Sequence, residues 1–115
     1  MQKTKSQPKA TSSVLLLGNP NVGKTTLFNR FCGLRSATSN FPGSTVEARI
    51  GTSSSGATKR TFTDLPGLYT LHASDDLSKV CRNALDGIDC NSPEAVLVVI
   101  DATNLRRNLT IVNEI

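Results

Sequence analysis

Tryptophan is absent from this sequence of 115 residues, and tyrosine and histidine occur once each. Long apolar runs are absent too. VLLL at 14–17 and AVLVVI at 95–100 fall far short of the roughly 20 residues that a membrane-spanning helix needs. The first thirteen residues, MQKTKSQPKATSS, contain no apolar stretch like that of a secretory signal peptide. We therefore expect that nothing in these residues crosses a membrane, and that any core is built mainly from valine, leucine and isoleucine.

Cysteine is scarce, and the three that are present show no C-x-x-C spacing and leave one thiol over after any pairing: Cys32, Cys81 and Cys90. This pattern favours a reducing compartment and ordinary buried or surface thiols rather than disulfides or zinc ligands. His72 is the only histidine, which is typical of a structural or surface residue.

Acidic residues are missing from the N-terminal arm, residues 1–13, which carries Lys3, Lys5 and Lys9. These lysines account for much of the formal net charge of +4, so the rest of the chain is close to balanced. A strongly basic face is not indicated, and we expect no nucleic-acid partner. The arm itself is predicted to be flexible and basic.

From residue 14 onward, alternating strand and helix signals predict one α/β domain, at 14–115, with a mostly parallel sheet. The expected elements are strand 14–17, helix 25–31, strands 45–52 and 58–67, a helix around 77–85, strand 95–100 and a helix from 104 onward. The SSSGA turn predicts that strands 45–52 and 58–67 are antiparallel neighbours, and residues 35–44 are expected to form a polar loop. Strands 14–17 and 95–100 are expected to be fully buried.

Three of these elements have an apolar face that we expect to point into the core. The faces consist of Leu27, Phe28 and Phe31 in the first helix, Val46, Ala48 and Ile50 in strand 45–52, and Leu105, Leu109 and Val112 in the last helix. Because a strand as apolar as 95–100 needs neighbours on both sides, we expect the fold to be incomplete, with C-terminal strands missing.

The sequence GNPNVGKTT at 18–26 matches the pattern G-x-x-x-x-G-K-[ST] in full, between a predicted strand and a predicted helix. Its glycines permit backbone angles that turn successive N–H groups toward one anion, and the helix aims the positive end of its dipole at the same point. Lys24 is expected to reach the β- and γ-phosphates, and Thr25 offers a hydroxyl oxygen suited to Mg²⁺. The predicted binding residues are Gly18, Asn19, Pro20, Asn21, Val22, Gly23, Lys24, Thr25 and Thr26.

A second candidate for phosphate chemistry is the segment DLPG, which consists of Asp64, Leu65, Pro66 and Gly67 at the end of a predicted strand. In that position Asp64 is able to hold Mg²⁺ through water, and the Gly67 N–H to contact a γ-phosphate. An isolated D-x-x-G is often only a turn. Its place after a phosphate loop and a strand pair favours the nucleotide role.

Two further features allow two interpretations each. Thr45, which follows Gly43 and Ser44 in a loop, either adds a second hydroxyl to Mg²⁺ or simply begins a strand. Arg106 and Arg107 suggest an arginine finger, but an exposed helix face explains them better.

Together, GNPNVGKTTLFN, NFPGSTVE, DLPGLYTL and DATNLRRNL resemble the N-terminal GTPase domain of the ferrous iron transport protein B (FeoB) family, from about residue 14 to 115. The resemblance implies a Ras-like G domain of the P-loop NTPase class, with GTP as ligand and substrate and Mg²⁺ as cofactor. It also implies coupling to Fe²⁺ uptake at the cytoplasmic face of a bacterial inner membrane. The expected partner is the membrane portion of the same parent protein.

By position, the resemblance implies that residues 18–25 are the phosphate loop, residues 43–47 the first switch with Thr45 on Mg²⁺, and residues 64–67 the second switch motif. Asn21 falls where potassium-activated relatives place a K⁺-coordinating asparagine, although an asparagine there also serves as a turn residue.

Many GTPases orient the attacking water with a glutamine just after D-x-x-G, but this sequence has Leu68 there. Catalysis must then depend on backbone groups, Mg²⁺ and possible K⁺ near Asn21, because phosphoryl transfer needs positioning and charge neutralisation above all. The catalytic candidates are Lys24, Thr45, Asn21 and Gly67. We expect slow hydrolysis, as in a switch.

The N-K-x-D motif that normally confers guanine specificity does not occur in the sequence, so the choice of GTP rests on the resemblance. Two other interpretations remain open. One is a soluble Ras-like GTPase of ribosome or tRNA maturation, with the basic arm on RNA. The other is a non-catalytic nucleotide-binding fragment.

Overall fold

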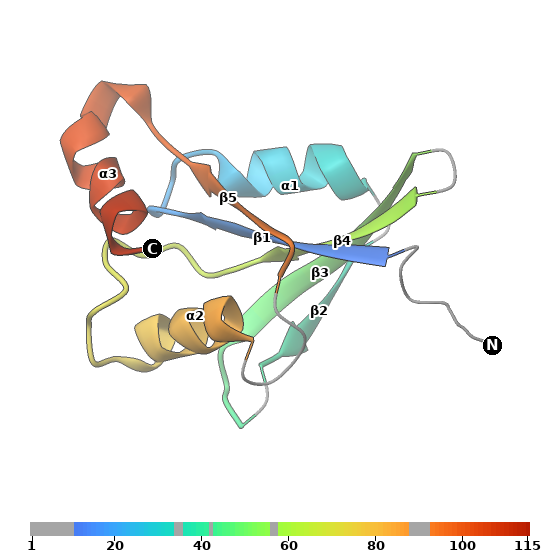
Figure 1. Ribbon diagram of the computed structural model, residues 1–115, viewed down its shortest axis with the longest axis horizontal. Coiled ribbons are helices and arrows are strands. Elements are labelled where there is room, and N and C mark those ends of the chain that lie inside the picture. The colour runs from blue at the N-terminus through green and yellow to red at the C-terminus, as the bar shows by residue number, and fades with distance from the viewer. Residues whose placement is uncertain (1–10, 34–35, 42, 56–57, 88–92) are drawn as a thin grey trace.

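The computed structural model describes residues 11–33, 36–41, 43–55, 58–87 and 93–115. The elements in chain order are strand β1 (Thr11–Gly18), helix α1 (Lys24–Cys32), strands β2 (Ser36–Asn40), β3 (Glu47–Ser55) and β4 (Thr58–Asp64), helix α2 (Asp76–Asp86), strand β5 (Ala95–Val99), the short 3₁₀ helix η3 (Ala102–Asn104) and helix α3 (Leu105–Glu114) (Figure 1). The α/β class predicted from the sequence is confirmed.

The five strands of the described ranges form one sheet in the order β2-β3-β4-β1-β5. Strand β1 pairs in parallel with both β4 and β5, whereas β3 pairs antiparallel with β4 and with β2. Four of these strands therefore run in one direction and β3 runs against them, which confirms the mostly parallel sheet and the antiparallel pair.

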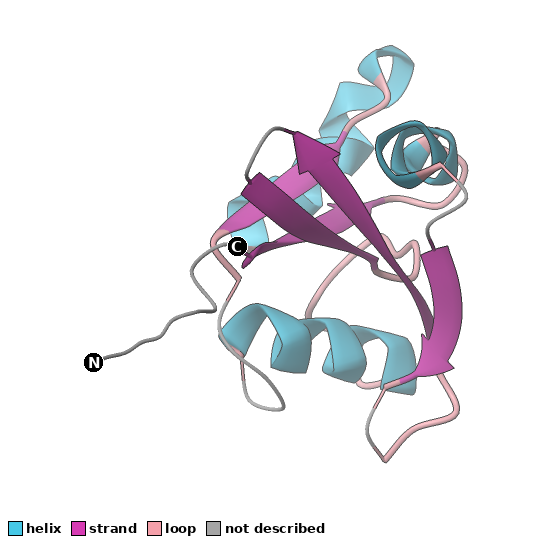
Figure 2. Ribbon diagram, turned by 90° about the vertical axis from the view of Figure 1, so that its right-hand side faces the viewer, coloured by secondary structure: helices cyan, strands magenta, loops and turns pink. Residues whose placement is uncertain are grey.

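Strand β1 lies in the interior of the sheet and places its side chains alternately on two faces. On one face, Leu15 and Leu17 belong to a buried cluster that includes Leu65, Leu68 and Leu71 together with Cys81 of α2 and Ile111 of α3. On the other face, Val14 and Leu16 pack with Phe28 and Cys32 of α1 and with Phe62 of β4. Helices α1 and α2 accordingly lie on opposite sides of the sheet (Figures 1 and 2). The prediction that strand 14–17 is buried on both faces is confirmed.

Helices α1 and α2 are bounded by capping residues. Helix α1 ends at Gly33, whose N–H bonds to the carbonyl oxygen of Asn29 at 2.7 Å. Helix α2 is preceded by its N-cap Asp75, whose carboxylate accepts a hydrogen bond from the Ser78 N–H at 2.9 Å. It ends at Gly87, which has the left-handed conformation (φ 70°) that glycine adopts without steric cost.

The structure corrects several expected element bounds. Residues 11–13, which we assigned to the flexible arm, belong to β1, and residues 1–10 lie outside the described ranges. The segment 36–40, expected within a polar loop, is strand β2, because it pairs with β3 from Ser36 opposite Gly51 to Asn40 opposite Glu47. Strand β3 begins at residue 47 rather than 45, and β4 ends at 64 rather than 67. Residues 56 and 57 of the expected turn lie outside the described ranges.

The expected inward face of the last helix is wrong. Leu105, Leu109 and Val112 are 49%, 43% and 41% exposed, whereas Ile111 and Asn108 are buried. The helix is oriented by Asn108, because its carboxamide accepts from the Asp101 N–H at 3.1 Å and donates to the Asn104 carbonyl at 2.8 Å. That orientation directs Ile111, one turn further on, into the cluster beside β1.

Three other burial expectations are also revised. Strand β5 is the last strand of the described sheet, so its Ala95 and Leu97 are exposed rather than fully buried. In the first helix Phe28 is buried as expected, but Phe31 is partly exposed and stacks on Phe62, with ring centroids 4.9 Å apart. Of the three expected inward positions in strand 45–52, only Ala48 is buried; Val46 precedes β3 and is half-buried, and Ile50 is exposed.

Candidate nucleotide-binding site

The connection from β1 to α1 folds as a loop with two left-handed residues. Asn21 has φ 65° and Gly23 has φ 92°. Asparagine tolerates this region better than most residues, and glycine adopts it without strain. Gly23 is also the N-cap of α1, where no side chain caps the helix. The N–H groups at the start of α1 therefore remain available to an anion.

This loop borders a pocket of about 400 Å³ that is lined by seven of the nine residues 18–26 and by Gly67, but not by the other predicted binding residues. The lining residues are Asn19, Pro20, Asn21, Gly23, Lys24, Thr25, Thr26 and Gly67. Gly67 lies so close to the loop that a Cβ added to it would be 2.9 Å from the Pro20 Cα. The structure thus brings the phosphate loop and the DLPG segment together, as the sequence predicts for two parts of one site.

Lys24 and Asp64, predicted to contact different parts of a ligand, form an ion pair with each other. The Lys24 Nζ also donates to the carbonyl oxygen of Leu65 at 2.6 Å. Both charged side chains are buried, and burial is tolerated because each charge has its partner. The ion pair therefore joins the phosphate loop directly to the DLPG segment.

Asn19 is a buried polar residue of the pocket lining whose side chain lacks hydrogen-bond partners. Its side chain is 3% exposed, and neither its amide nitrogen nor its carbonyl oxygen makes a hydrogen bond. Leaving such a group unsatisfied costs on the order of 1–3 kcal/mol. A buried polar group without a protein partner indicates a water molecule or polar ligand at that place.

The side chains at the pocket fit Mg²⁺. Thr25 supplies a hydroxyl oxygen at the pocket wall and Asp64 a carboxylate beside it. Magnesium prefers hard oxygen ligands and is usually held by one or two protein oxygens together with nucleotide phosphates and water. In the described part of the chain there is no cluster of three His, Cys, Asp or Glu side chains suited to a metal.

The structure places Thr45 away from this pocket. Gly43, Ser44 and Thr45 line a separate pocket of about 370 Å³, whose other wall is helix α2. Thr45 is exposed, and the Ser44 hydroxyl accepts a hydrogen bond from the Val46 N–H at 2.9 Å. The predicted first-switch residues are thus not brought together with the phosphate loop.

Leu68 is buried in the cluster beside β1, and its N–H donates to the Gly18 carbonyl at 3.1 Å. Its side chain is apolar and packed in the core, so it has no group that could orient an attacking water. The sequence does not predict that Glu114 and Arg82 bond to the segment after DLPG, nor that Arg107 contacts Tyr69. No sequence pattern identifies these contacts, since they join positions far apart in the chain.

The sheet order, the phosphate loop and the adjoining DLPG define a P-loop nucleotide-binding domain with the GTPase fold. The chain belongs to the family described as Ferrous iron transport protein B, which matches residues 12–115. The Fe(2+) transporters FeoB of Leptospira biflexa and Methanocaldococcus jannaschii are each 41% identical, over 97 and 96 residues. Each alignment covers 84% of this chain and 14% of the relative's length.

The chain is also similar to solved structures of FeoB G domains. The G domain of the T. maritima FeoB iron transporter has a TM-score of 0.82 and 36% identity, covering 90% of this chain and 64% of that one. A GDP-bound mutant of the S. thermophilus FeoB G-domain has a TM-score of 0.78 and 38% identity, with 90% and 38% covered. The chain thus spans less than two thirds of each. Within its described ranges, no helix is both long enough and apolar enough to traverse a bilayer.

Proposed function

We propose that this chain binds GTP with Mg²⁺ and hydrolyses it slowly, as the switch domain of a ferrous iron transport protein. The observation that carries the proposal is the pocket shared by the phosphate loop, the start of α1 and Gly67. The present sequence has no N-K-x-D motif from which the base could be inferred. The choice of guanine over adenine therefore rests on the GDP bound to the S. thermophilus relative.

In this proposal the backbone N–H groups of residues 18–25 and the start of α1 hold the phosphates. Lys24 exchanges its bonds to Asp64 and Leu65 for bonds to the phosphates. Asn19 offers a polar partner for a ligand or a bridging water. The Gly67 N–H contacts the terminal phosphate.

Thr25 and Asp64 would hold Mg²⁺, with Thr45 as a further ligand. When bound, the ion neutralises charge on the phosphate oxygens. Thr45 lines a different pocket in this structure, so its participation requires the segment 43–46 to move toward the phosphate loop. Because Leu68 is buried and apolar, no side chain orients the attacking water at the usual position, which accounts for slow hydrolysis.

The same family membership supports a parent protein that transports Fe²⁺, with this domain on the cytoplasmic side of a bacterial inner membrane. The membrane portion of that parent is the proposed partner. These parts of the proposal concern a protein much longer than this chain, since the curated relatives are covered to only 14%.

The nucleotide is tested by titrating the full chain into fluorescent GDP and a slowly hydrolysed GTP analogue, with ATP as competitor. We expect guanine nucleotide to bind and excess ATP not to displace it. Replacing Lys24 with alanine is expected to weaken analogue binding by about ten- to a hundredfold, because a charge-assisted hydrogen bond is lost. Lys59→Ala, an exposed lysine of β4, is the matched control. Displacement by ATP at equal concentration contradicts guanine specificity.

Potassium activation is tested by measuring GTP hydrolysis in K⁺ and in Na⁺ buffers. If Asn21 coordinates K⁺, the wild type is faster in K⁺, and Asn21→Ala loses the difference. Asn29→Ala, an exposed asparagine of α1, is expected to keep it. If wild type and Asn21→Ala each hydrolyse GTP equally fast in both buffers, the potassium proposal is refuted. Asn21 is then only a turn residue, as its left-handed backbone conformation indicates.

A further inference from the structure

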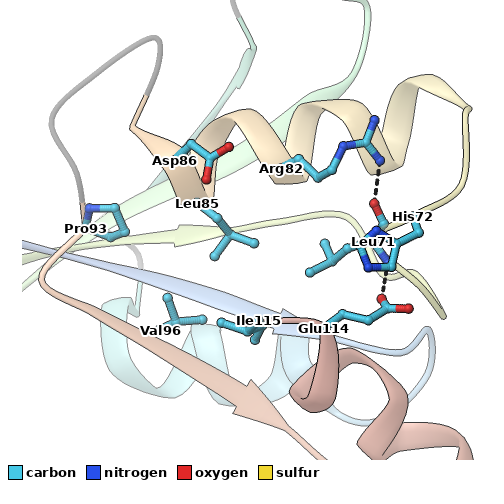
Figure 3. Close-up of a pocket in the computed structure, with 9 residues that line it drawn as sticks. All are labelled: Leu71, His72, Arg82, Leu85, Asp86, Pro93, Val96, Glu114 and Ile115. Atoms are coloured by element: carbon cyan, nitrogen blue, oxygen red, sulfur yellow. Dashed lines mark hydrogen bonds between the residues drawn. The ribbon is translucent and has the colours of Figure 1, made fainter.

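The segment that follows DLPG is held by one carboxylate from the far end of the chain. The Leu71 N–H donates to Glu114 Oε1 at 2.6 Å, and the Thr70 hydroxyl donates to Glu114 Oε2 at 2.7 Å. Both oxygens of a single side chain are thereby used on two consecutive residues. Figure 3 shows Glu114 extending from α3 toward Leu71.

A second contact from α3 lies on the same segment. The Arg107 guanidinium is 4.8 Å from the centroid of the Tyr69 ring, a cation–π geometry. Positions 107 and 114 are two helical turns apart and share one face. Between them, Ile111 is fully buried in the cluster beside β1. Helix α3 is therefore anchored to the core, while two of its charged side chains, Arg107 and Glu114, contact residues 69–71.

Helix α2 restrains the same segment from the opposite direction. Arg82 donates to the carbonyl oxygen of Leu71 (Figure 3) and, at 3.0 Å, to that of Ala73. The Ser78 hydroxyl donates to the Thr70 carbonyl at 3.1 Å. Thr70 is thus bonded through its hydroxyl and its carbonyl, and Leu71 through its N–H and its carbonyl, although neither belongs to a helix or strand.

The restrained segment continues directly into the nucleotide site. Leu68 donates its N–H to the Gly18 carbonyl, and Gly67 rests against Pro20. Only Leu68 separates Gly67 from Tyr69. Leu68 therefore connects residues 69–71 both to Gly67 and, through its bond to Gly18, to the start of the phosphate loop.

We propose that Arg107 and Glu114 are positioning residues, which hold Tyr69–Leu71 so that α3 and the Gly67 contact with a terminal phosphate are coupled. The inference rests on the proposed function, since it requires that a nucleotide triphosphate binds beside Gly67. Coupling is reciprocal: if α3 favours the position that suits the triphosphate, binding of the triphosphate stabilises the contacts of α3.

The ionised form of Glu114 suits this role. Partial burial acts to raise its pKa, but the hydrogen bonds from Leu71 and Thr70, with a smaller contribution from His72, lower it below the ordinary value. At neutral pH both carboxylate oxygens are therefore acceptors. Glutamine offers only one carbonyl oxygen, so Glu114→Gln is expected to keep the bond from Leu71 and alter the one from Thr70.

The first test measures the ratio of affinities for a slowly hydrolysed GTP analogue and for GDP. Glu114→Ala is expected to lower this ratio on the order of tenfold, because a charge-assisted hydrogen bond pair is lost. Arg107→Ala is expected to lower it about threefold, as for a partly exposed cation–π contact. GDP affinity is expected to change less than about twofold in each. Arg106→Ala and Asn113→Ala, exposed neighbours on α3, serve as matched controls.

The second test does not need a nucleotide. Tyr69 is the only tyrosine and there is no tryptophan, so intrinsic emission reports on this residue alone. The neutral quencher acrylamide is expected to quench Tyr69 more strongly in Arg107→Ala than in Arg106→Ala, because loss of the Arg107 guanidinium uncovers the face of the ring. Equal quenching overturns the contact.

The outcomes separate the two proposals. If a variant loses GDP and analogue affinity equally and melts at a lower temperature, α3 is merely structural and the inference is overturned. A ratio of analogue to GDP affinity that stays at the wild-type value overturns it as well. If Glu114→Ala does not fold, Thr70→Val and Glu114→Gln test the same bonds with smaller changes. If the wild type binds neither nucleotide, the proposed function fails and the inference fails with it. If the wild type binds nucleotide and the Arg107 and Glu114 variants keep its ratio of affinities, only the inference is refuted.

Discussion

Gly67 has no room for a side chain, and this makes Gly67→Ala a sharp perturbation of the site. The added Cβ would lie 2.9 Å from Pro20 Cα, 3.0 Å from Pro20 N and 3.3 Å from Pro20 Cγ. Two of these three atoms are backbone atoms that no rotamer change can move. The DLPG segment must therefore withdraw from the phosphate loop until the contacts reach the ordinary separation of about 3.5–4.0 Å.

The expected size of the effect follows from this geometry. Overpacking costs about 1–3 kcal/mol, and the lower half of that range applies because both partners are in loops rather than in the sheet. For a domain of this size the melting temperature should fall by about 5–10 °C. The displaced Gly67 N–H also loses its contact with a terminal phosphate, which corresponds to roughly a ten- to hundredfold loss of triphosphate affinity. Diphosphate affinity should change little.

The assay combines thermal unfolding with titration of GDP and a slowly hydrolysed GTP analogue. Gly18→Ala is the comparison, since its Cβ would lie 2.8 Å from the Val99 carbonyl oxygen of the neighbouring strand. That variant is expected to lower stability and to affect both nucleotides alike. A Gly67→Ala chain that melts like the wild type and binds the triphosphate equally well would refute the proposed role of this contact.

Three further predictions concern the scaffold. Phe28→Ala removes a fully buried ring of α1 and is expected to destabilise the chain by about 3–5 kcal/mol in urea unfolding, whereas a cost below about 1 kcal/mol contradicts its place in the core. Asp75→Ala removes the cap of α2 and should lower the melting temperature. The Ser78 N–H lowers the pKa of Asp75, so the wild-type advantage should be present at neutral pH and vanish as the pH falls below about 4; an advantage that persists in acid argues against the cap. Burial raises the pKa of Cys81 to about 12, so in a Cys90→Ser chain this thiol should react with a thiol reagent only on unfolding, which mass spectrometry of the labelled chain detects; rapid native labelling counts against the prediction.

Local signals made much of the fold and half of the site predictable. The strand, glycine-rich loop and helix from 14 to 31 are specified by neighbouring residues, and so is the position of DLPG after a strand. Strand β2 was missed because SATSN has no apolar alternation and becomes a strand only through pairing with β3. The face of α3 was assigned wrongly because hydrophobic spacing favoured Leu105 and Leu109, whereas hydrogen bonds of Asn108 set the rotation of the helix.

The site contacts that escaped prediction are all tertiary. Lys24 and Asp64 were each expected in the site, but their ion pair depends on the parallel register of β1 and β4. The bonds of Glu114 to Thr70 and Leu71 depend on how α3 docks on the sheet, for which the sequence contains no local signal. Whether Thr45 joins the metal site stays a prediction, since it lines another pocket here.

The central position of β1 also has a kinetic consequence. This strand pairs with no neighbour in sequence: Thr11 lies opposite Lys59, and Val14 lies opposite Ala95. Closing such long loops costs entropy before any contact offsets it, so sheets of this kind fold more slowly than local helical pairs. The phosphate loop begins where β1 ends, and Gly67 reaches it only after β4 has paired. A growing chain on the ribosome is therefore expected to acquire its nucleotide pocket only after β4 and Gly67 have emerged.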